Sequence, residues 1–314
     1  MLDLTLLGSG GGMPMPNRHL SSMIIGYEGR KILIDCGEGT QVAMRKVRSG
    51  FRAIDIICIS HYHGDHIFGL PGLLSTIGNS DRKKPITIIG PVGLKKIMEG
   101  LLVSHAYLPY KINLIEAAKR DIGFRMSSGI LQENIEDEKN EIIFSTLKLN
   151  HSSPCLGYSL YLPRNPKFYP EKAIDSGIPK QMWSKLQNGE EVHHEGKIYK
   201  PDMVLGEDRK GIKLSFVTDT RPTDTIPAFI EGSDLFVCEG TYGDNADIKK
   251  AIKNKHMTFK EAADLANEGK VKELLLTHFS PAMDNPSIFG SNARSIFKNT
   301  ILGYDGYKRI LNYD

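Results

Sequence analysis

Short apolar runs recur along the chain, and each ends in polar or glycine-rich sequence. A run of about four to eight residues between such boundaries is typical of a strand that is buried in a sheet. The pattern therefore predicts strands at 4–7, 22–26, 31–40 with its terminal turn, 54–59, 86–89, 144–149, 214–217 and 274–276.

Helical spacing occurs between several of these strands. Helices are predicted after the strand at 31–40 and from Gly93 to Gly100. A third helix is predicted up to Ala266, where Thr258 is the N-cap and Glu261 completes a capping box. The alternation of strands and helices predicts an α/β fold.

Four of the predicted strands run into residues that can bind a metal ion. The strand at 54–59 leads to His61-Tyr62-His63-Gly64-Asp65-His66, and the strands at 144–149, 214–217 and 274–276 lead to His151, Asp219 and His278. Side chains at strand ends along one edge of a sheet can converge. A surface histidine cluster and single structural histidines are the alternatives, but the four strand ends together favour a metal site.

The candidate ligands divide into two sets. His61, His63 and His151 would hold one ion, Asp65, His66 and His278 a second, and Asp219, the only carboxylate expected at a strand end, would bridge them. Imidazole and carboxylate ligands suit zinc. Two ions about 3.5–4 Å apart activate water and favour hydrolysis of phosphodiesters. The prediction is two Zn²⁺ per chain, with Mn²⁺ or Fe²⁺ as possible substitutes.

The composition is that of an ordinary globular enzyme. The 314 residues are 40% hydrophobic and 25% charged, and the net charge of +3 permits a nucleic-acid partner without requiring one. The four scattered cysteines indicate reduced thiols and not a disulfide framework. Because the sequence shows neither a leader nor an apolar stretch of membrane-spanning length, we expect a cytoplasmic protein without membrane contact.

A proline-rich stretch from about 163 to 211 interrupts the alternation of strands and helices. It contains five prolines and the single tryptophan, Trp183. Between 164 and 187, its basic residues outnumber its acidic ones by three. This insertion can contact a phosphate backbone, and a lid or a dimer contact is equally open. The residues expected at phosphates are Lys167, Lys172, Lys180 and Lys185.

The glycine-rich segment Gly8–Pro14 cannot be helical. Its glycines lack the spacing of either nucleotide-binding fingerprint. We therefore expect a tight structural loop near the active site, with a phosphate-binding loop as the alternative.

The segment from His61 to His66 is the H-x-H-x-D-H signature of the metallo-β-lactamase superfamily. Within that superfamily, the chain resembles ribonuclease Z, the zinc endonuclease that trims transfer-RNA precursors at the 3′ end. The resemblance runs nearly end to end and is carried by Gly8–Pro14, Asp35–Gln41, Gly69–Leu73, His151–Tyr158, Thr218–Arg221 and Leu276–Ser280.

The resemblance implies a four-layer αββα sandwich, a single domain over 1–314 with an inserted substrate-binding arm at about 163–211. It implies the same seven metal ligands, with Asp219 shared. It further implies that Asp65 accepts a proton from the attacking water, that His256 protonates the leaving ribose oxygen, and that Glu239 orients His256. The partners would be precursor tRNA and a second subunit, because in the family the arm of one subunit of a homodimer grips the tRNA bound to the other.

Two departures from the family leave the substrate open. The family's His-Glu-Ala-Thr segment reads Cys238-Glu239-Gly240-Thr241 here, and Ile178–Trp183 stands in place of a Gly-Pro arm tip. A sister hydrolase acting on small phosphodiesters, sulfate esters or lactones would keep all seven ligands and is the main alternative. His63 disfavours a diiron redox protein of the same fold, and the complete ligand set disfavours a non-catalytic RNA-binding relative.

Overall fold

The computed structural model describes residues 1–103, 107–117, 121–134 and 139–314. The chain divides into two compact units. The larger unit contains Met1–Tyr161 and Lys213–Asn312, and the smaller unit contains Leu162–Ile212 and Tyr313–Asp314. The expectation of one domain over 1–314 with an arm at about 163–211 stays a prediction.

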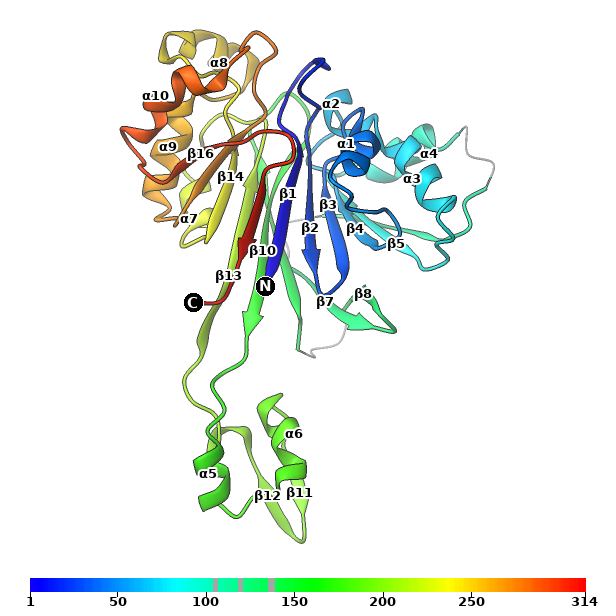
Figure 1. The fold of residues 1–314 in the computed structure, drawn as a ribbon, viewed down its shortest axis with the longest axis vertical. Coiled ribbons are helices and arrows are strands. Elements are labelled where there is room, and N and C mark those ends of the chain that lie inside the picture. The colour runs from blue at the N-terminus through cyan, green and yellow to red at the C-terminus, as the bar shows by residue number, and fades with distance from the viewer. Residues whose placement is uncertain (104–106, 118–120, 135–138) are drawn as a thin grey trace. The chain divides into compact units, whose positions relative to one another are not determined.

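The first sheet of the larger unit has seven strands in the order β17-β1-β2-β3-β4-β5-β6. Their bounds are β1 (Leu2–Gly8), β2 (Ser22–Tyr27), β3 (Arg30–Ile34), β4 (Ile54–Cys58), β5 (Ile86–Gly90), β6 (Ile112–Glu116) and β17 (Lys308–Leu311). The helices α1 (Thr40–Lys46), α2 (Gly64–Ile67), α3 (Leu70–Gly78) and α4 (Leu94–Leu101) cover its outer face (Figure 1).

The second sheet has eight strands in the order β16-β15-β14-β13-β10-β9-β7-β8. Their bounds are β7 (Ile122–Ser127), β8 (Ile130–Glu133), β9 (Ile142–Leu149), β10 (Cys155–Arg164), β13 (Arg209–Val217), β14 (Leu235–Glu239), β15 (Leu274–Thr277) and β16 (Thr300–Leu302). The face of this sheet that points away from the first sheet is covered by the helices α7 (Ile226–Ile230), α8 (Ile248–Asn254), α9 (Phe259–Glu268) and α10 (Gly290–Arg294) (Figure 1). The predicted four-layer αββα sandwich is therefore confirmed.

Strands β4, β5 and β15 form where the sequence predicts them, whereas β14 was not predicted. All residues of β4, β5, β14 and β15 are buried, and these strands pair in parallel with their neighbours. Parallel strands read as continuous apolar runs for this reason. The capping box of α9 is present as predicted, with Thr258 accepting from the Glu261 N–H.

The smaller unit has a core of its own. It contains α5 (Pro170–Asp175), α6 (Trp183–Gln187), a hairpin of β11 (Val192–His194) with β12 (Lys197–Tyr199), and the 3₁₀ turns η1 (Lys180–Met182) and η2 (Pro201–Met203). The side chains buried there are Ala173, Ile178, Met182, Leu186, Val192, Tyr199 and Val204. A cluster of this size makes the insertion a folded module.

Two further sequence predictions bear on the fold. Cys36, Cys58, Cys155 and Cys238 are all free and buried, as expected for reduced thiols. Within the part of the chain that the structure describes, no helix has both the length and the apolar character needed to cross a bilayer.

Candidate metal centre

The histidine signature occupies the loop after β4 and the short helix α2. His61 and His63 lie in the loop, and α2 begins directly after His63, so that Asp65 and His66 project from its first turn. His61 and His66 are buried, whereas His63 is partly exposed. The six-residue segment thus presents two candidate ligands from a loop and two from a helical turn.

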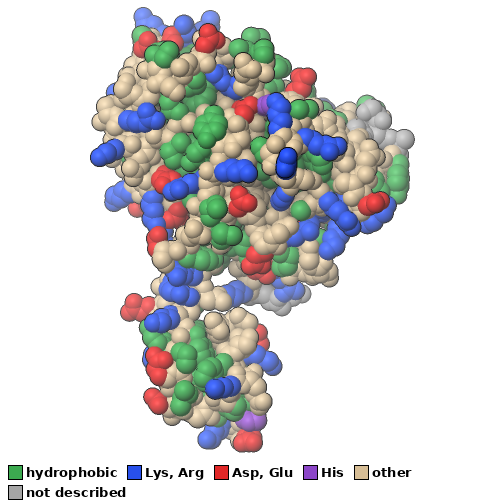
Figure 2. Space-filling model, viewed as in Figure 1, with side chains coloured by type: hydrophobic (Ala, Val, Ile, Leu, Met, Phe, Trp, Pro, Cys, Tyr) green, Lys and Arg blue, Asp and Glu red, His purple; other side chains and the backbone are tan. Residues whose placement is uncertain are grey.

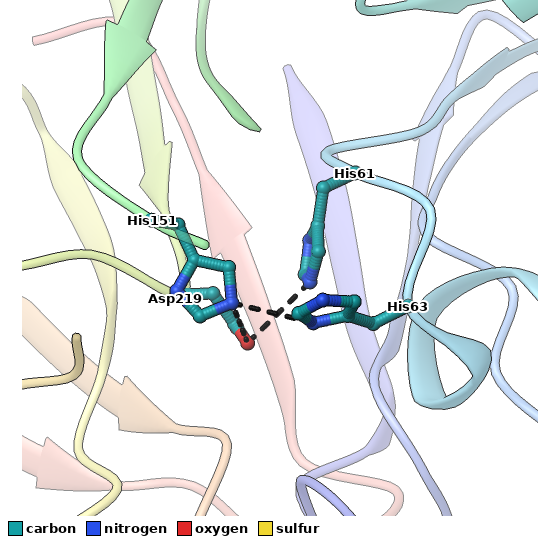
Figure 3. A group of neighbouring side chains, drawn as sticks. All are labelled: His61, His63, His151 and Asp219. Atoms are coloured by element: carbon teal, nitrogen blue, oxygen red, sulfur yellow. Dashed lines mark hydrogen bonds and ion pairs between the residues drawn. The ribbon is translucent and has the colours of Figure 1, made fainter. Parts of the chain in front are cut away.

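Three more candidate ligands follow strands of the second sheet. His151 follows β9, Asp219 follows β13 and His278 follows β15. The structure brings them to the histidine signature, as Figure 3 shows for His151 and Asp219. The expectation that all ligands share one edge of a single sheet is wrong, because β4 belongs to the first sheet and the other three strands to the second.

One group of donor atoms comprises His61, His63, His151 and Asp219 (Figure 3). The Oδ2 atom of Asp219 lies 3.6 Å from Nε2 of His61 and 3.8 Å from Nε2 of His151. The Nε2 atom of His151 lies 3.3 Å from Nδ1 of His63. Three nitrogens and one oxygen therefore converge.

A second group comprises Asp65, His66 and His278. The Nε2 atoms of His66 and His278 are 3.1 Å apart, and they lie 3.4 and 3.3 Å from Oδ2 of Asp65. The other carboxylate oxygen of Asp219, Oδ1, lies 3.3 Å from His66 and 3.2 Å from His278. Each oxygen of Asp219 thus faces a different group, as a bridging ligand requires.

These separations fit metal coordination. At metal–nitrogen distances of about 2.0–2.1 Å, two ligand atoms of a tetrahedral site are about 3.3–3.4 Å apart. The Nε2 atom of His61 is also buried, and it has no hydrogen-bond partner among the described residues. A buried nitrogen without a partner is costly unless an ion or another group binds it. The described residues therefore contain clusters that can hold metal ions.

Asp35 and Ser60 support the buried imidazoles from behind. Asp35 accepts from the N–H and the hydroxyl of Ser60 at 2.7 and 2.8 Å, and its Oδ2 lies 2.8 Å from Nδ1 of His66. The Ser60 hydroxyl lies 3.0 Å from Nδ1 of His61. These contacts turn the Nε2 atoms toward the ligand cluster, which is the usual role of such partners.

The remaining imidazoles are fixed in the same way. Nδ1 of His151 donates to the Lys255 carbonyl at 3.1 Å, while the Lys255 ammonium donates to the His151 carbonyl, also at 3.1 Å. Nδ1 of His278 lies 3.0 Å from the Thr241 hydroxyl. None of these supporting residues was expected from the sequence. The polar ends of buried strands were a signal only for Asp35, which follows β3 as Asp219 follows β13.

Backbone geometry also aims ligands inward. Asp35, Asp219 and His278 adopt positive φ angles of 57°, 30° and 58°. Non-glycine residues rarely occupy this region, and the strain, of order 1 kcal/mol per residue, persists only where the surrounding structure enforces it. All three follow directly on, or one residue after, a buried strand, so the chain turns sharply and directs the side chain into the site.

His256 lies between the ligand cluster and Glu239. Its Nδ1 donates to the carboxylate of Glu239 at 3.1 Å, and its Nε2 lies 3.9 Å from Oδ2 of Asp219. Glu239 is fully buried and also accepts from the N–H groups of Thr220 and Met257. Glu239 is thus rigidly held. Because Asp219, His256 and His278 form a third, overlapping group of donors, His256 is close enough to act on a bound substrate.

The pKa values reflect this crowding. Burial lowers the pKa of His61 well below its usual value, whereas at His66 the carboxylates of Asp219 and Asp35 outweigh burial and raise the pKa of the imidazole. Burial opposes ionisation of Asp219, but His278, His66 and His61 outweigh it and hold the pKa of Asp219 well below its usual range. Burial also lowers the pKa of His256, but the carboxylate of Glu239 outweighs it and raises that pKa to about 9.

Cys238, which stands where the family has a histidine, does not face the ligand cluster. Successive residues of a strand point to opposite faces. Glu239 faces His256, whereas Cys238 is buried in the core beneath α9, with its Sγ 3.7 Å from Sδ of Met257. The replacement of the family's histidine by cysteine therefore changes core packing and leaves the carboxylate that holds His256 in place.

The glycine-rich loop lies at the ligand cluster, as predicted. The Gly12 N–H donates to Oδ2 of Asp65 at 2.6 Å. A Cβ at Gly11 would lie 2.3 Å from the His278 ring, so only glycine fits there. The loop is a structural wall of the site, and glycine is required for its close approach.

A cavity of about 390 Å³ gives access to the cluster. Its lining includes five of the seven candidate ligands, together with His256, Gly12, Ser152 and the segment Lys253–Lys255. The cavity joins a potential metal site, a histidine of raised pKa and cationic side chains in one space. Such a space suits an anionic substrate.

The four lysines that the sequence predicts at phosphates, Lys167, Lys172, Lys180 and Lys185, lie in the smaller unit, and all are exposed. The ammonium groups of Lys167 and Lys172 lie 5.0 and 4.9 Å from the centre of the Tyr169 ring, and that of Lys180 lies 5.9 Å from the Trp183 ring. On the face seen in Figure 2, cationic side chains of this unit are interspersed with acidic and hydrophobic ones. The cationic side chains do not form one compact patch on that face.

The segment Ile178–Trp183, which replaces the family's Gly-Pro tip, is partly buried in the smaller unit. Ile178 and Met182 are buried, and the Trp183 indole N–H donates to the Ile178 carbonyl at 3.0 Å. This segment packs the module, so its sequence is constrained by the small core as well as by any ligand.

The chain is similar in sequence to known proteins. The chain matches the family model described as Anti-Pycsar protein Apyc1 over residues 2–187. A curated relative, ribonuclease Z of Alkaliphilus oremlandii (strain OhILAs), is 60% identical over 315 aligned residues, covering 100% of this chain and 99% of the relative.

Solved structures give the same picture. The short form of human tRNase Z is 26% identical with a TM-score of 0.67, and the match covers 99% of each chain. The metallo-β-lactamase fold protein YhfI from Bacillus subtilis, 17% identical with a TM-score of 0.68 over 99% of this chain and 100% of that one, shares the fold. With this fold, the ligand cluster and a relative of 60% identity over its full length, the chain belongs to the ribonuclease Z family.

Proposed function

We propose that the protein is a zinc-dependent endoribonuclease that removes the 3′ trailer of tRNA precursors by two-metal hydrolysis. The observation that carries the proposal is the position of Asp219, whose two oxygens face two separate groups of imidazoles. Membership of the ribonuclease Z family supports tRNA as the substrate.

The seven ligands would hold two zinc ions between the two sheets. Bound zinc supplies Lewis acidity, which polarises the phosphodiester and makes water a better nucleophile at neutral pH. The ligands would be His61, His63, His151 and Asp219 in one group, and Asp65, His66, His278 and Asp219 in the other.

In this proposal, Asp65 takes the proton of the attacking water. Its Oδ2 accepts from Gly12 and faces His66 and His278, which fixes the carboxylate. It lines the cavity through which substrate reaches the cluster. A carboxylate that is held fixed in the wall of the cavity can accept a proton without moving.

His256 would protonate the leaving ribose oxygen. With Nδ1–H donated to Glu239, the Nε2 atom faces the cavity and the ligand cluster. Glu239 acts as a positioning residue, since it fixes the ring and stabilises its protonated form. Proton donation to the leaving oxygen makes strand scission easier.

The smaller unit would bind the body of the tRNA. Its exposed lysines, Lys167, Lys172, Lys180 and Lys185, offer ammonium groups to phosphates. Within the same proposal, the protein is a cytoplasmic homodimer in which each arm serves the partner's active site. Sedimentation at micromolar concentration tests the dimer, and a monomer would contradict it.

The deciding experiment compares two substrates. Labelled precursor tRNA and the chromogenic diester bis(p-nitrophenyl) phosphate are incubated separately with the purified protein. We expect endonucleolytic release of the 3′ trailer at a rate well above diester turnover. Rapid diester turnover without any tRNA cleavage would reject tRNA as the substrate and favour a sister hydrolase of small phosphodiesters.

A further inference from the structure

A second, strongly basic pocket lies on the larger unit. It has a volume of about 340 Å³ and is lined by Arg30, Arg52, Ala53, Arg82, Lys83 and Lys84. It shares no lining residue with the cavity at the metal centre. Lysine and arginine side chains are also seen gathered on the larger unit beneath α3 and α4 in Figure 2.

The pocket lies at the opposite end of the first sheet from the ligands. Ala53 precedes β4, whereas His61 follows it, and Lys84 precedes β5. A five-residue strand spans about 15 Å. A ligand in this pocket would therefore be separated from the metal centre by the length of β4.

Two guanidinium groups form a fixed floor. Arg82 is only 2% exposed, and it donates to the carbonyls of Arg52 and Lys84 at 2.7 and 2.8 Å and to Asp55 at 2.8 Å. Arg30 donates to the same carboxylate through Nε and Nη2. One buried carboxylate thus serves two arginines, and one positive charge remains unbalanced.

The upper part of the pocket adds three more cations. The Lys84 ammonium donates to the carbonyls of Ser128 and Gly129, which are neutral acceptors. Arg52 and Lys83 are exposed and make no ion pair within the described ranges. Five cations therefore face one carboxylate, although the whole chain carries only +3. Asp81, which precedes Arg82, is exposed and does not line the pocket.

This arrangement selects for an anion of high charge density. Guanidinium and ammonium groups are the usual ligands of phosphate oxygens, and arginine offers paired N–H donors. Among the residues that the structure describes, the lining of the pocket offers no carboxylate, histidine or hydroxyl that could carry out acid–base chemistry. We propose that it is a binding site for a phosphate group, supplied either by an RNA backbone or by a free phosphate anion.

The first arm of the test measures binding directly. Radiolabelled inorganic phosphate is dialysed at low ionic strength against the metal-loaded wild type, the double variant Arg52→Ala/Lys83→Ala, and the control Lys96→Ala/Lys298→Ala. The control removes two exposed lysines elsewhere and matches the change in charge. We expect the pocket variant to bind one phosphate fewer than the wild type, and the control to bind as the wild type does. Equal binding by all three proteins would overturn the proposal.

The second arm identifies the source of the phosphate. If an RNA backbone occupies the pocket, the pocket variant should show a KM for precursor tRNA raised about tenfold and a shallower salt dependence, with unchanged turnover of bis(p-nitrophenyl) phosphate. If KM is unchanged although the variant no longer binds phosphate there, a free anion is the ligand. This arm rests on the proposed function, whereas the dialysis does not, so failure to cleave tRNA would leave the first arm decisive.

Discussion

The metal centre and the smaller unit hold their polar side chains in opposite ways. At the centre, His61 and His66 are buried and their Nδ1 atoms have specific partners. In the smaller unit, Lys172 and Lys180 are exposed, and their ammonium groups lie near aromatic rings. One region fixes donor atoms, and the other leaves them free to adjust.

The difference follows from what each region has to do. Hydrolysis needs donor atoms held to within a fraction of an ångström, which buried networks provide. Binding of a flexible polyanion depends on charge more than on fixed geometry, and exposed lysines supply it. The comparison predicts that substitutions at the centre abolish all hydrolysis, whereas changes in the smaller unit affect only large substrates.

The largest effect is expected for Asp219→Ala. Because Asp219 faces both groups of imidazoles, its removal should lower the metal content per chain and abolish hydrolysis of tRNA and of the small diester alike. Metal analysis by mass spectrometry and both activity assays measure this. Asp224→Ala, at an exposed aspartate five residues on, is the control. A normal metal content with full activity would reject the bridging assignment.

His256→Ala should separate chemistry from metal binding. Removal of a general acid slows cleavage by about 10²–10⁴-fold. The variant should keep its metals and its affinity for precursor tRNA, whereas Asp65→Ala should lose metal as well. Single-turnover rates and metal content distinguish these cases. His193→Ala, at a largely exposed histidine of the smaller unit, is the control. Cleavage by His256→Ala at the wild-type rate would show that the role of His256 is structural.

Removal of the insertion tests whether the smaller unit matters only for large substrates. Because β10 and β13 are neighbours in the sheet, residues 165–208 can be replaced by a short glycine-containing turn. We expect precursor-tRNA cleavage to fall at least about tenfold, since the lysines that bind phosphates are removed, while small-diester turnover stays nearly unchanged. Steady-state kinetics on both substrates provide the measurement. Undiminished tRNA processing would refute the role of the insertion in binding.

The smallest effect is expected for single lysines of the smaller unit. Lys172→Ala or Lys180→Ala should weaken tRNA binding severalfold and make the logarithmic salt dependence shallower by about one unit for each phosphate that the variant no longer neutralises. Filter binding at several salt concentrations measures this, with Lys298→Ala as the control. If the slope remains that of the wild type, the substituted lysine does not bind a phosphate.

Local sequence was a good guide where one segment supplies its own context. The histidine signature, the glycine-rich loop and the capped helix α9 each depend on neighbours within a few residues, and each was predicted. Asp35 was missed, and Asp219 was wrongly expected to be the only carboxylate at a strand end. Asp35 follows β3 directly, but its contacts with Ser60 and His66 depend on the pairing of β3 with β4, which joins positions far apart in the sequence.

The sequence by itself determined the residues that can carry the chemistry and the family to which the chain belongs. Short apolar strands and the H-x-H-x-D-H segment are local patterns, and local patterns survive without knowledge of the fold. Only the tertiary structure decided that the ligands come from two sheets, that Cys238 faces the core, and that five cations surround a second pocket. The physical reason is that strand order and the packing of one sheet on the other depend on contacts between distant segments, which no single segment encodes.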